Sequence, residues 1–161
     1  MPTNFSKIIN LGGSDLEMCM PRVGKTNQVS SSFGLMQYNG SAPASISTAG
    51  AATYTAAQLL GGIIVRDPNG AGRTDTLPTA ALLVAAVNAY GSGAQVGDLI
   101  TFLVVNGADA AEAITVAAGS GGAFDANQTA ASRTIAQNAS KTIYVRLTNV
   151  TSGAEAYVIY A

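Results

Sequence analysis

Histidine and tryptophan are both absent from this chain of 161 residues, and only one cysteine, Cys19, is present. The commonest general base and the commonest metal-binding side chain in proteins are therefore missing. This disfavours hydrolase sites that pair serine or cysteine with histidine, and zinc sites built on histidine. A lone cysteine also forms no intrachain disulfide, so stability has to come from packing or oligomerisation. The sequence predicts a protein that is not an enzyme, with no catalytic residues, no cofactor and no metal ligands.

Charged residues are also scarce. They make up 11% of the chain against roughly 25% in typical soluble domains, and the net charge is only -1. Because interspersed surface charge opposes self-association, we expect copies of the chain or a larger assembly to cover much of its surface. The eight basic residues form no basic run, which argues against nucleic acid as a partner. No apolar run reaches the roughly 18 residues needed to cross a bilayer, so we expect no membrane partner.

The chain divides into two parts by composition. Residues 1–43 have mixed polar residues and only short apolar pieces, which predicts an N-terminal arm or attachment segment. Such an arm is either disordered or extended against a neighbouring subunit. Residues 44–161 show strand-like patterns separated by clusters of glycine, asparagine, serine and aspartate, which predicts one β-rich domain.

Alternation of apolar and polar residues marks the clearest strand, at residues 142–150. Such a pattern is typical of a half-buried antiparallel strand. With residues 154–160, it predicts a hairpin. Residues 98–105 predict a more deeply buried strand, with residues 113–116 as its neighbour across a turn. Shorter elements are expected too: strands at 53–55, 63–65 and 132–136, and one helical turn at 56–60.

One segment predicts a full helix, over residues 80–87. Asp75 or Thr76 is the expected cap, Pro78 is expected in the first turn, and Gly91 is expected to end the helix. Several short strands, frequent turns and a single helix together predict a mainly-β fold. The expected architecture is a β-sandwich of jelly-roll or Greek-key type, with one short helix and the N-terminal arm.

Charged side chains are concentrated in one segment, residues 66–75. We interpret four of them as a structural charge cluster with Arg–Asp pairs within or between subunits: Arg66, Asp67, Arg73 and Asp75. The start of the segment is similar to a calcium-binding loop at Asp67, Asn69 and Gly70, but Pro68 interrupts it and the later acidic ligand is missing. A cation site and recognition of a partner remain alternatives.

Several short sequence segments resemble those of small virion proteins of tailed bacteriophages and some large DNA viruses. The resemblance spans residues 44–161 and is carried by residues 47–50, 53–55, 60–70, 73–75, 78–80 and 151–156. It includes no catalytic signature. It implies a module on the capsid surface of the virion: a capsid decoration or cement protein, plausibly a homotrimer. Such a structural protein binds the major capsid protein and stabilises the shell.

The same composition is compatible with a different virion component, a fibre, spike or tail module that recognises a host surface or glycan. Sugar sites commonly use exposed aromatic side chains beside polar groups. The candidates for that role are the six tyrosines, Tyr38, Tyr54, Tyr90, Tyr144, Tyr157 and Tyr160.

Overall fold

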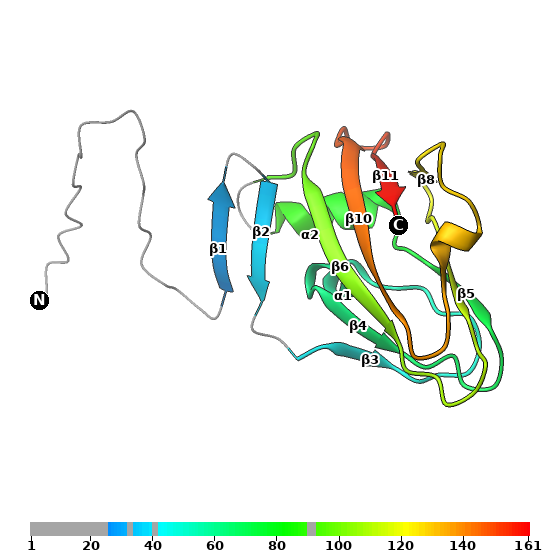
Figure 1. The fold of residues 1–161 in the computed structure, drawn as a ribbon. Helices are drawn as coiled ribbons and strands as arrows, with labels where there is room; N and C mark the ends of the chain where they lie inside the picture. The colour runs from blue at the N-terminus through cyan, green and yellow to red at the C-terminus, as the bar shows by residue number, and fades with distance from the viewer. Residues whose placement is uncertain (1–25, 32–33, 40–41, 90–92) are drawn as a thin grey trace, which may run out of the picture.

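A computed structural model describes residues 26–31, 34–39, 42–89 and 93–161 (Figure 1). Cys19, Tyr90 and Gly91 lie outside these ranges, as does much of the predicted arm. Within the arm, β1 (Thr26–Ser31) and β2 (Gly34–Asn39) pair with each other as an antiparallel hairpin.

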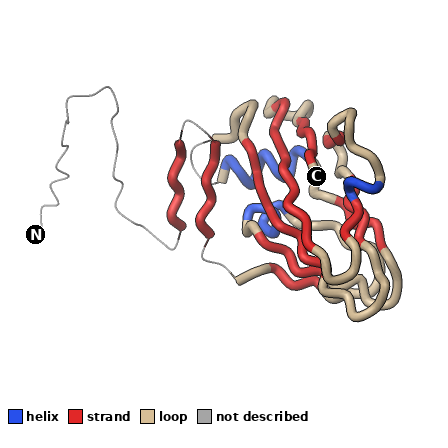
Figure 2. The backbone as a smooth tube through the Cα atoms, viewed as in Figure 1, coloured by secondary structure: helices blue, strands red, loops and turns tan. Residues whose placement is uncertain are grey.

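Most of the remaining strands lie in one sheet of six strands (Figure 2). Its strands occur in the order β3 (Ala44–Ile46), β4 (Ile63–Arg66), β6 (Leu99–Asn106), β10 (Ser140–Asn149), β11 (Ala156–Tyr160) and β8 (Gly122–Phe124). A separate sheet of three strands has the order β5 (Arg73–Thr76), β7 (Ile114–Ala117) and β9 (Thr134–Ile135), with the 3-10 turn η1 (Ala131–Arg133) just before β9. The expected mainly-β class is confirmed, with the strands divided among several sheets.

The larger sheet is antiparallel at its centre and parallel towards both edges. Strand β10 pairs antiparallel with β6 on one side and with β11 on the other. The pairs β3/β4, β4/β6 and β11/β8 are parallel. The predicted hairpin between residues 142–150 and 154–160 is therefore confirmed, with Tyr144 opposite Tyr160.

The predicted partner of the strand at 113–116 is wrong. Strand β7 does not pair with β6; it pairs with β5 and β9 in the smaller sheet. Both edges of β6 are already occupied by β4 and β10, which leaves no free ladder for β7. Side chains of β7 such as Ile114 and Val116 are buried in the shared core, which they enter from the smaller sheet.

Two helices complete the domain. In α1 (Ala56–Leu60), Thr55 and Gln58 form a capping box, in which each side chain accepts a hydrogen bond from the other's backbone N–H. In α2 (Ala80–Asn88), the Thr79 side chain accepts from the third residue of the helix. No helix within the described ranges is long and apolar enough to span a membrane.

The predicted start of the longer helix is also wrong in detail. Asp75 and Thr76 do not cap it, because both belong to β5, and Asp75 is buried. Pro78 lies before the cap at Thr79 and not inside the first turn. The chain leaves β5 and turns at Leu77 and Pro78 before the helix begins, a step that a sequence pattern does not reveal.

The hydrophobic core lies on one face of the six-stranded sheet. Phe102, Val145 and Ile159 from that sheet pack in one cluster with residues of the smaller sheet and of both helices. Figure 1 shows α1 and α2 on one side of β6 and β10. The other face of the large sheet is consequently not part of this core.

Phe102→Ala tests this assignment of faces. Phe102 is 1% exposed, so its truncation is expected to lower the free energy of unfolding by about 3–5 kcal/mol. Its neighbour Thr101 points away from the core, and Thr101→Ala should change stability by less than about 0.5 kcal/mol. Urea unfolding of both variants checks the difference, and equal effects would contradict the assignment.

Candidate functional site

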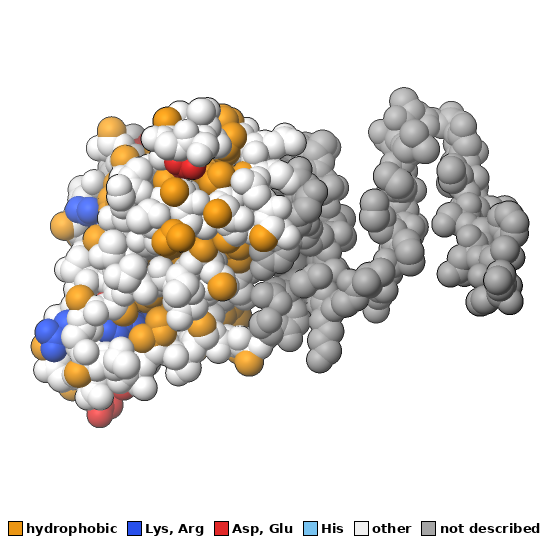
Figure 3. Space-filling view, turned by 180° about the vertical axis from the view of Figure 1, so that it is seen from behind, with side chains coloured by type: hydrophobic (Ala, Val, Ile, Leu, Met, Phe, Trp, Pro, Cys, Tyr) orange, Lys and Arg blue, Asp and Glu red, His pale blue; other side chains and the backbone are white. Residues whose placement is uncertain are grey.

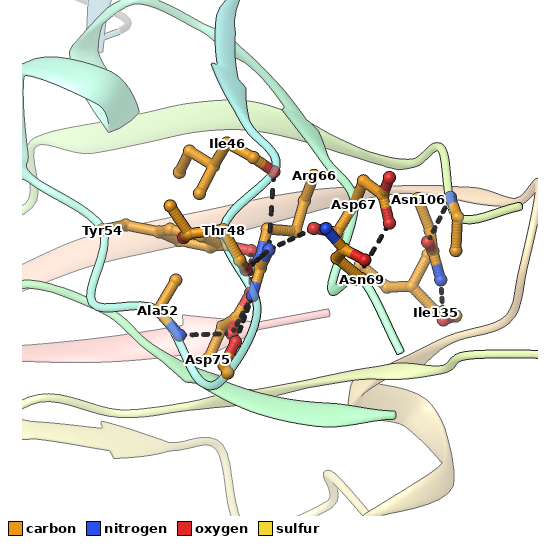
Figure 4. A network of polar contacts seen from close by, with 12 residues as sticks. Ile46, Thr48, Ala52, Tyr54, Arg66, Asp67, Asn69, Asp75, Asn106 and Ile135 are labelled. Atoms are coloured by element: carbon orange, nitrogen blue, oxygen red, sulfur yellow. Dashed lines mark hydrogen bonds and ion pairs between the residues drawn. The ribbon is translucent and has the colours of Figure 1, made fainter. Parts of the chain in front are cut away.

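Arg66 and Asp75 form a fully buried ion pair. Nε of Arg66 lies 2.8 Å from Oδ2 of Asp75, and neither side chain is exposed to solvent. Arg66 ends β4 in the larger sheet, whereas Asp75 belongs to β5 in the smaller one. The ion pair therefore connects the two sheets inside the domain (Figure 4).

The guanidinium of Arg66 also organises the chain that leaves β3. Its Nη1 donates to the carbonyl of Thr48 at 3.0 Å, and Nη2 donates to the carbonyl of Gly50 at 2.5 Å. The backbone carbonyls of Ile46 and Asp67 accept further bonds from Nη1. Burying a charge is costly unless its hydrogen-bonding groups are satisfied, and these carbonyls supply the acceptors.

The carboxylate of Asp75 is satisfied from two more donors. The backbone N–H of Ala52 donates to Oδ1 at 2.7 Å, and the hydroxyl of Tyr54 donates to Oδ2 at 2.9 Å. Burial raises the pKa of Tyr54 far above its usual range, and the charge of Asp75 and their hydrogen bond raise it further. Tyr54 is therefore a neutral hydrogen-bond donor, and the group has the character of a structural network.

Of the four residues predicted as a charge cluster, the structure joins Arg66 and Asp75 directly. Asp67 lies on the next turn, where its Oδ1 accepts from the backbone N–H of Asn69 at 2.9 Å. Arg73 forms no ion pair within the described residues, and its buried Nε has no hydrogen-bond partner there. Among the described residues, one ion pair therefore joins two of the four side chains.

A second polar group lies where β4 and β6 end. These parallel strands are neighbours, with Arg66 opposite Asn106, so the loops that follow them leave the sheet side by side, at the same end of the two strands. This brings together one carboxylate oxygen from each of Asp67, Asp109 and Glu112, all within 4.8 Å of one another. Sequence reasoning identified Asp67 but not the other two, because more than 40 residues separate them along the chain.

Asn106 fixes the loop that carries the two later acids. Its Nδ2 donates to the carbonyls of Glu112 at 2.7 Å and Ile135 at 3.1 Å, and its Oδ1 accepts from the N–H of Ala108. Asn106 is fully buried, so these bonds are shielded from water. The loop therefore has a defined shape.

The outward-facing side chains of β4, β6, β10 and β11 form a third candidate feature, named here the outer sheet face. Its apolar members are Ile63, Val65, Leu99, Leu103, Val105, Tyr144, Val158 and Tyr160. Of the described outward-facing residues on these four strands, Arg146 alone is charged. Figure 3 shows the molecule from behind, relative to the view of Figure 1. This side also has hydrophobic side chains with few charged ones between them.

Comparison with known proteins identifies no relative. No protein-family model matches the chain, and no curated protein or solved structure matches it either. The functional interpretation therefore depends on the residues themselves and on their arrangement.

Separate removal of the two ion-pair partners tests the importance of the buried link. Arg66→Met and Asp75→Asn should each lower the free energy of unfolding by about 3–5 kcal/mol. Each variant leaves the buried charged side chain of the other residue without its partner. The double variant should cost less than the sum of the two. Arg73→Met is the control from the same segment and should cost much less. An equal loss for Arg73→Met in urea unfolding would contradict a network centred on Arg66 and Asp75.

The raised pKa of Tyr54 predicts a loss of stability in alkali. Unfolded tyrosine ionises near pH 10, whereas the buried Tyr54 remains protonated in the folded state, so unfolding releases a proton above that pH. The contribution of Tyr54 is complete below about pH 10 and is lost as the pH rises further, at up to about 1.4 kcal/mol per pH unit. Burial also raises the pKa of Tyr157, which adds to the slope. Urea unfolding between pH 8 and 11 should give a smaller slope for Tyr54→Phe, and an unchanged slope would refute the assignment.

Proposed function

We propose that this chain is a non-enzymatic structural protein of a virus particle, a capsid decoration protein. In this proposal it forms a homotrimer on the capsid surface, binds the major capsid protein and stabilises the shell. The observation that supports an assembly function most directly is the apolar outer sheet face. The resemblance of residues 44–161 to small virion proteins supports the kind of assembly.

The outer sheet face has the composition of a surface that another protein covers. An antiparallel sheet with one solvated face usually alternates apolar inward residues with polar outward ones. Here leucine, isoleucine, valine and tyrosine occupy many outward positions, and Tyr144 is 43% exposed. Large exposed apolar patches usually mark interaction sites, and interface centres are depleted in charge.

The edges of the sheet favour contact through its face. The edge strands β3 and β8 have only three residues each, and short edge strands offer few free backbone groups to an added strand. Association by strand addition is therefore disfavoured. Copies of the chain, or the capsid protein, would dock against the outer sheet face.

The proposed architecture remains a β-sandwich. The shared core between the six-stranded sheet and the smaller sheet supports this interpretation. The parallel pairs, including β4/β6 and β5/β7, differ from the purely antiparallel pairing that a simple jelly roll would have.

Recognition of a glycan is a second candidate function, and one pair of tyrosines favours it. Tyr144 and Tyr160 face each other across β10 and β11 on the outer sheet face, whereas Tyr54 and Tyr157 are buried in the core. Neighbouring aromatic rings give a platform on which a sugar ring can stack. Glycan-array binding that is lost in Tyr144→Ala would support this function over capsid decoration.

Rebinding to capsids that lack the protein tests the decoration function. Tyr144→Glu places a charge on the outer sheet face and should weaken rebinding at least about tenfold, as expected for a central tyrosine of an interface. Leu82→Glu is the control, because Leu82 is 59% exposed on α2, away from the outer sheet face. Rebinding should persist at high salt, since few charges contribute to the face.

Failure of the unaltered protein to bind capsids at any salt concentration would contradict the decoration function. Equal rebinding by Tyr144→Glu and the unaltered protein would remove the outer sheet face from the interface.

A further inference from the structure

We propose that Asp67, Asp109 and Glu112 form a calcium-binding site. These residues lie in the loops that follow β4 and β6, at the end of the large sheet. This inference is independent of the outer sheet face and of the proposed capsid function. It assigns a ligand to a place where three carboxylates converge.

None of the three carboxylates forms an ion pair with lysine or arginine among the described residues. The ion pair in this part of the chain joins Arg66 to Asp75, and it includes none of the three. Three like charges within 4.8 Å of one another repel, and they repel more strongly where water is partly excluded. A bound cation converts this repulsion into attraction.

Glu112 provides a second and independent observation. Its side chain is buried, with a relative exposure of 4%, although it carries a carboxylate. Oε1 accepts from the backbone N–H of Gly70 at 2.5 Å, but Oε2 is buried and has no hydrogen-bond partner in the described structure. A buried carboxylate oxygen without a donor is costly, and coordination to a metal ion would satisfy it.

The donor set favours calcium over other common metal ions. All three side chains offer carboxylate oxygens, which are ligands for hard cations such as calcium. Oxygens that share one calcium ion at 2.3–2.6 Å are separated by at most about 5 Å, and the observed limit of 4.8 Å is compatible with this. Asp109 is exposed, so water can complete the coordination shell. Magnesium needs a stricter octahedron at shorter distances, and zinc prefers nitrogen and sulfur ligands.

The neighbouring backbone is arranged to hold the first ligand in place. The Asp67 side chain accepts from the N–H of Asn69, whose positive φ of 49° turns the chain sharply before Gly70. Gly70 in turn donates to Glu112, which joins the two loops. Asp67, in the segment that is similar to the start of a calcium-binding loop, thus supplies one ligand of the site. The other acidic ligands, Asp109 and Glu112, come from the loop after β6.

Calorimetric titration and thermal unfolding of the full chain test the site. After treatment with EDTA, addition of calcium chloride should release or absorb heat and raise the Tm. Asp109→Asn and Glu112→Gln should each weaken calcium binding at least about tenfold, because loss of even an outer-shell partner commonly costs that much. The matched control is Asp98→Asn, a loop aspartate whose Oδ2 accepts from the N–H of Gln95. It should bind calcium like the unaltered protein.

Asp109→Asn keeps the test decisive if Glu112→Gln folds poorly, because Asp109 is exposed. No heat and no change in Tm for the unaltered protein at millimolar calcium would overturn the proposal, since even weak extracellular sites bind in that range. Unchanged binding by Asp109→Asn would overturn it as well. An equal response to magnesium chloride would overturn the assignment to calcium. None of these outcomes depends on binding to capsids.

Discussion

The ion pair between Arg66 and Asp75 joins two sheets that have no paired strands in common. Burial of both charges would be unfavourable if their hydrogen-bonding groups were not satisfied. The backbone carbonyls between residues 46 and 50, the N–H of Ala52 and the hydroxyl of Tyr54 meet that requirement. The irregular segment between β3 and α1 therefore has a defined path, because its backbone groups form hydrogen bonds to the buried pair.

The same constraint positions the surfaces that we associate with function. Arg66 is held in the core, and the next residue, Asp67, therefore lies just beyond the end of β4, near Asp109 and Glu112. The smaller sheet and the helices pack on one face of the large sheet, and the outer sheet face is the opposite one, where we propose that an assembly partner docks. The buried core, the proposed cation site and the apolar outer sheet face are all compatible with the proposed role in reinforcing a shell.

Sequence patterns predicted the elements whose signal is local. The alternation in residues 142–150 identified β10, and the glycine-containing turn after it identified the hairpin with β11. Strand partners that depend on the whole topology were not accessible: the pattern of β7 shows that Ile114 is buried but not which strand lies beside it. Likewise, four charges close in sequence suggested Arg–Asp pairs, but the sequence did not indicate which of them pair: Arg66 pairs with Asp75, and Arg73 forms no ion pair among the described residues. The carboxylates of Asp109 and Glu112 join Asp67 only because two parallel strands end together.

We propose that copies of this charge-poor chain cover much of its surface. The most direct test is the mass of the purified protein in solution, measured by light scattering over a wide range of concentrations. The proposal predicts a stable trimer whose mass does not change on dilution or at high salt, because its interface contains few charges. A monomer at every concentration would contradict the claim, since an exposed apolar sheet face would then have no partner from the chain itself.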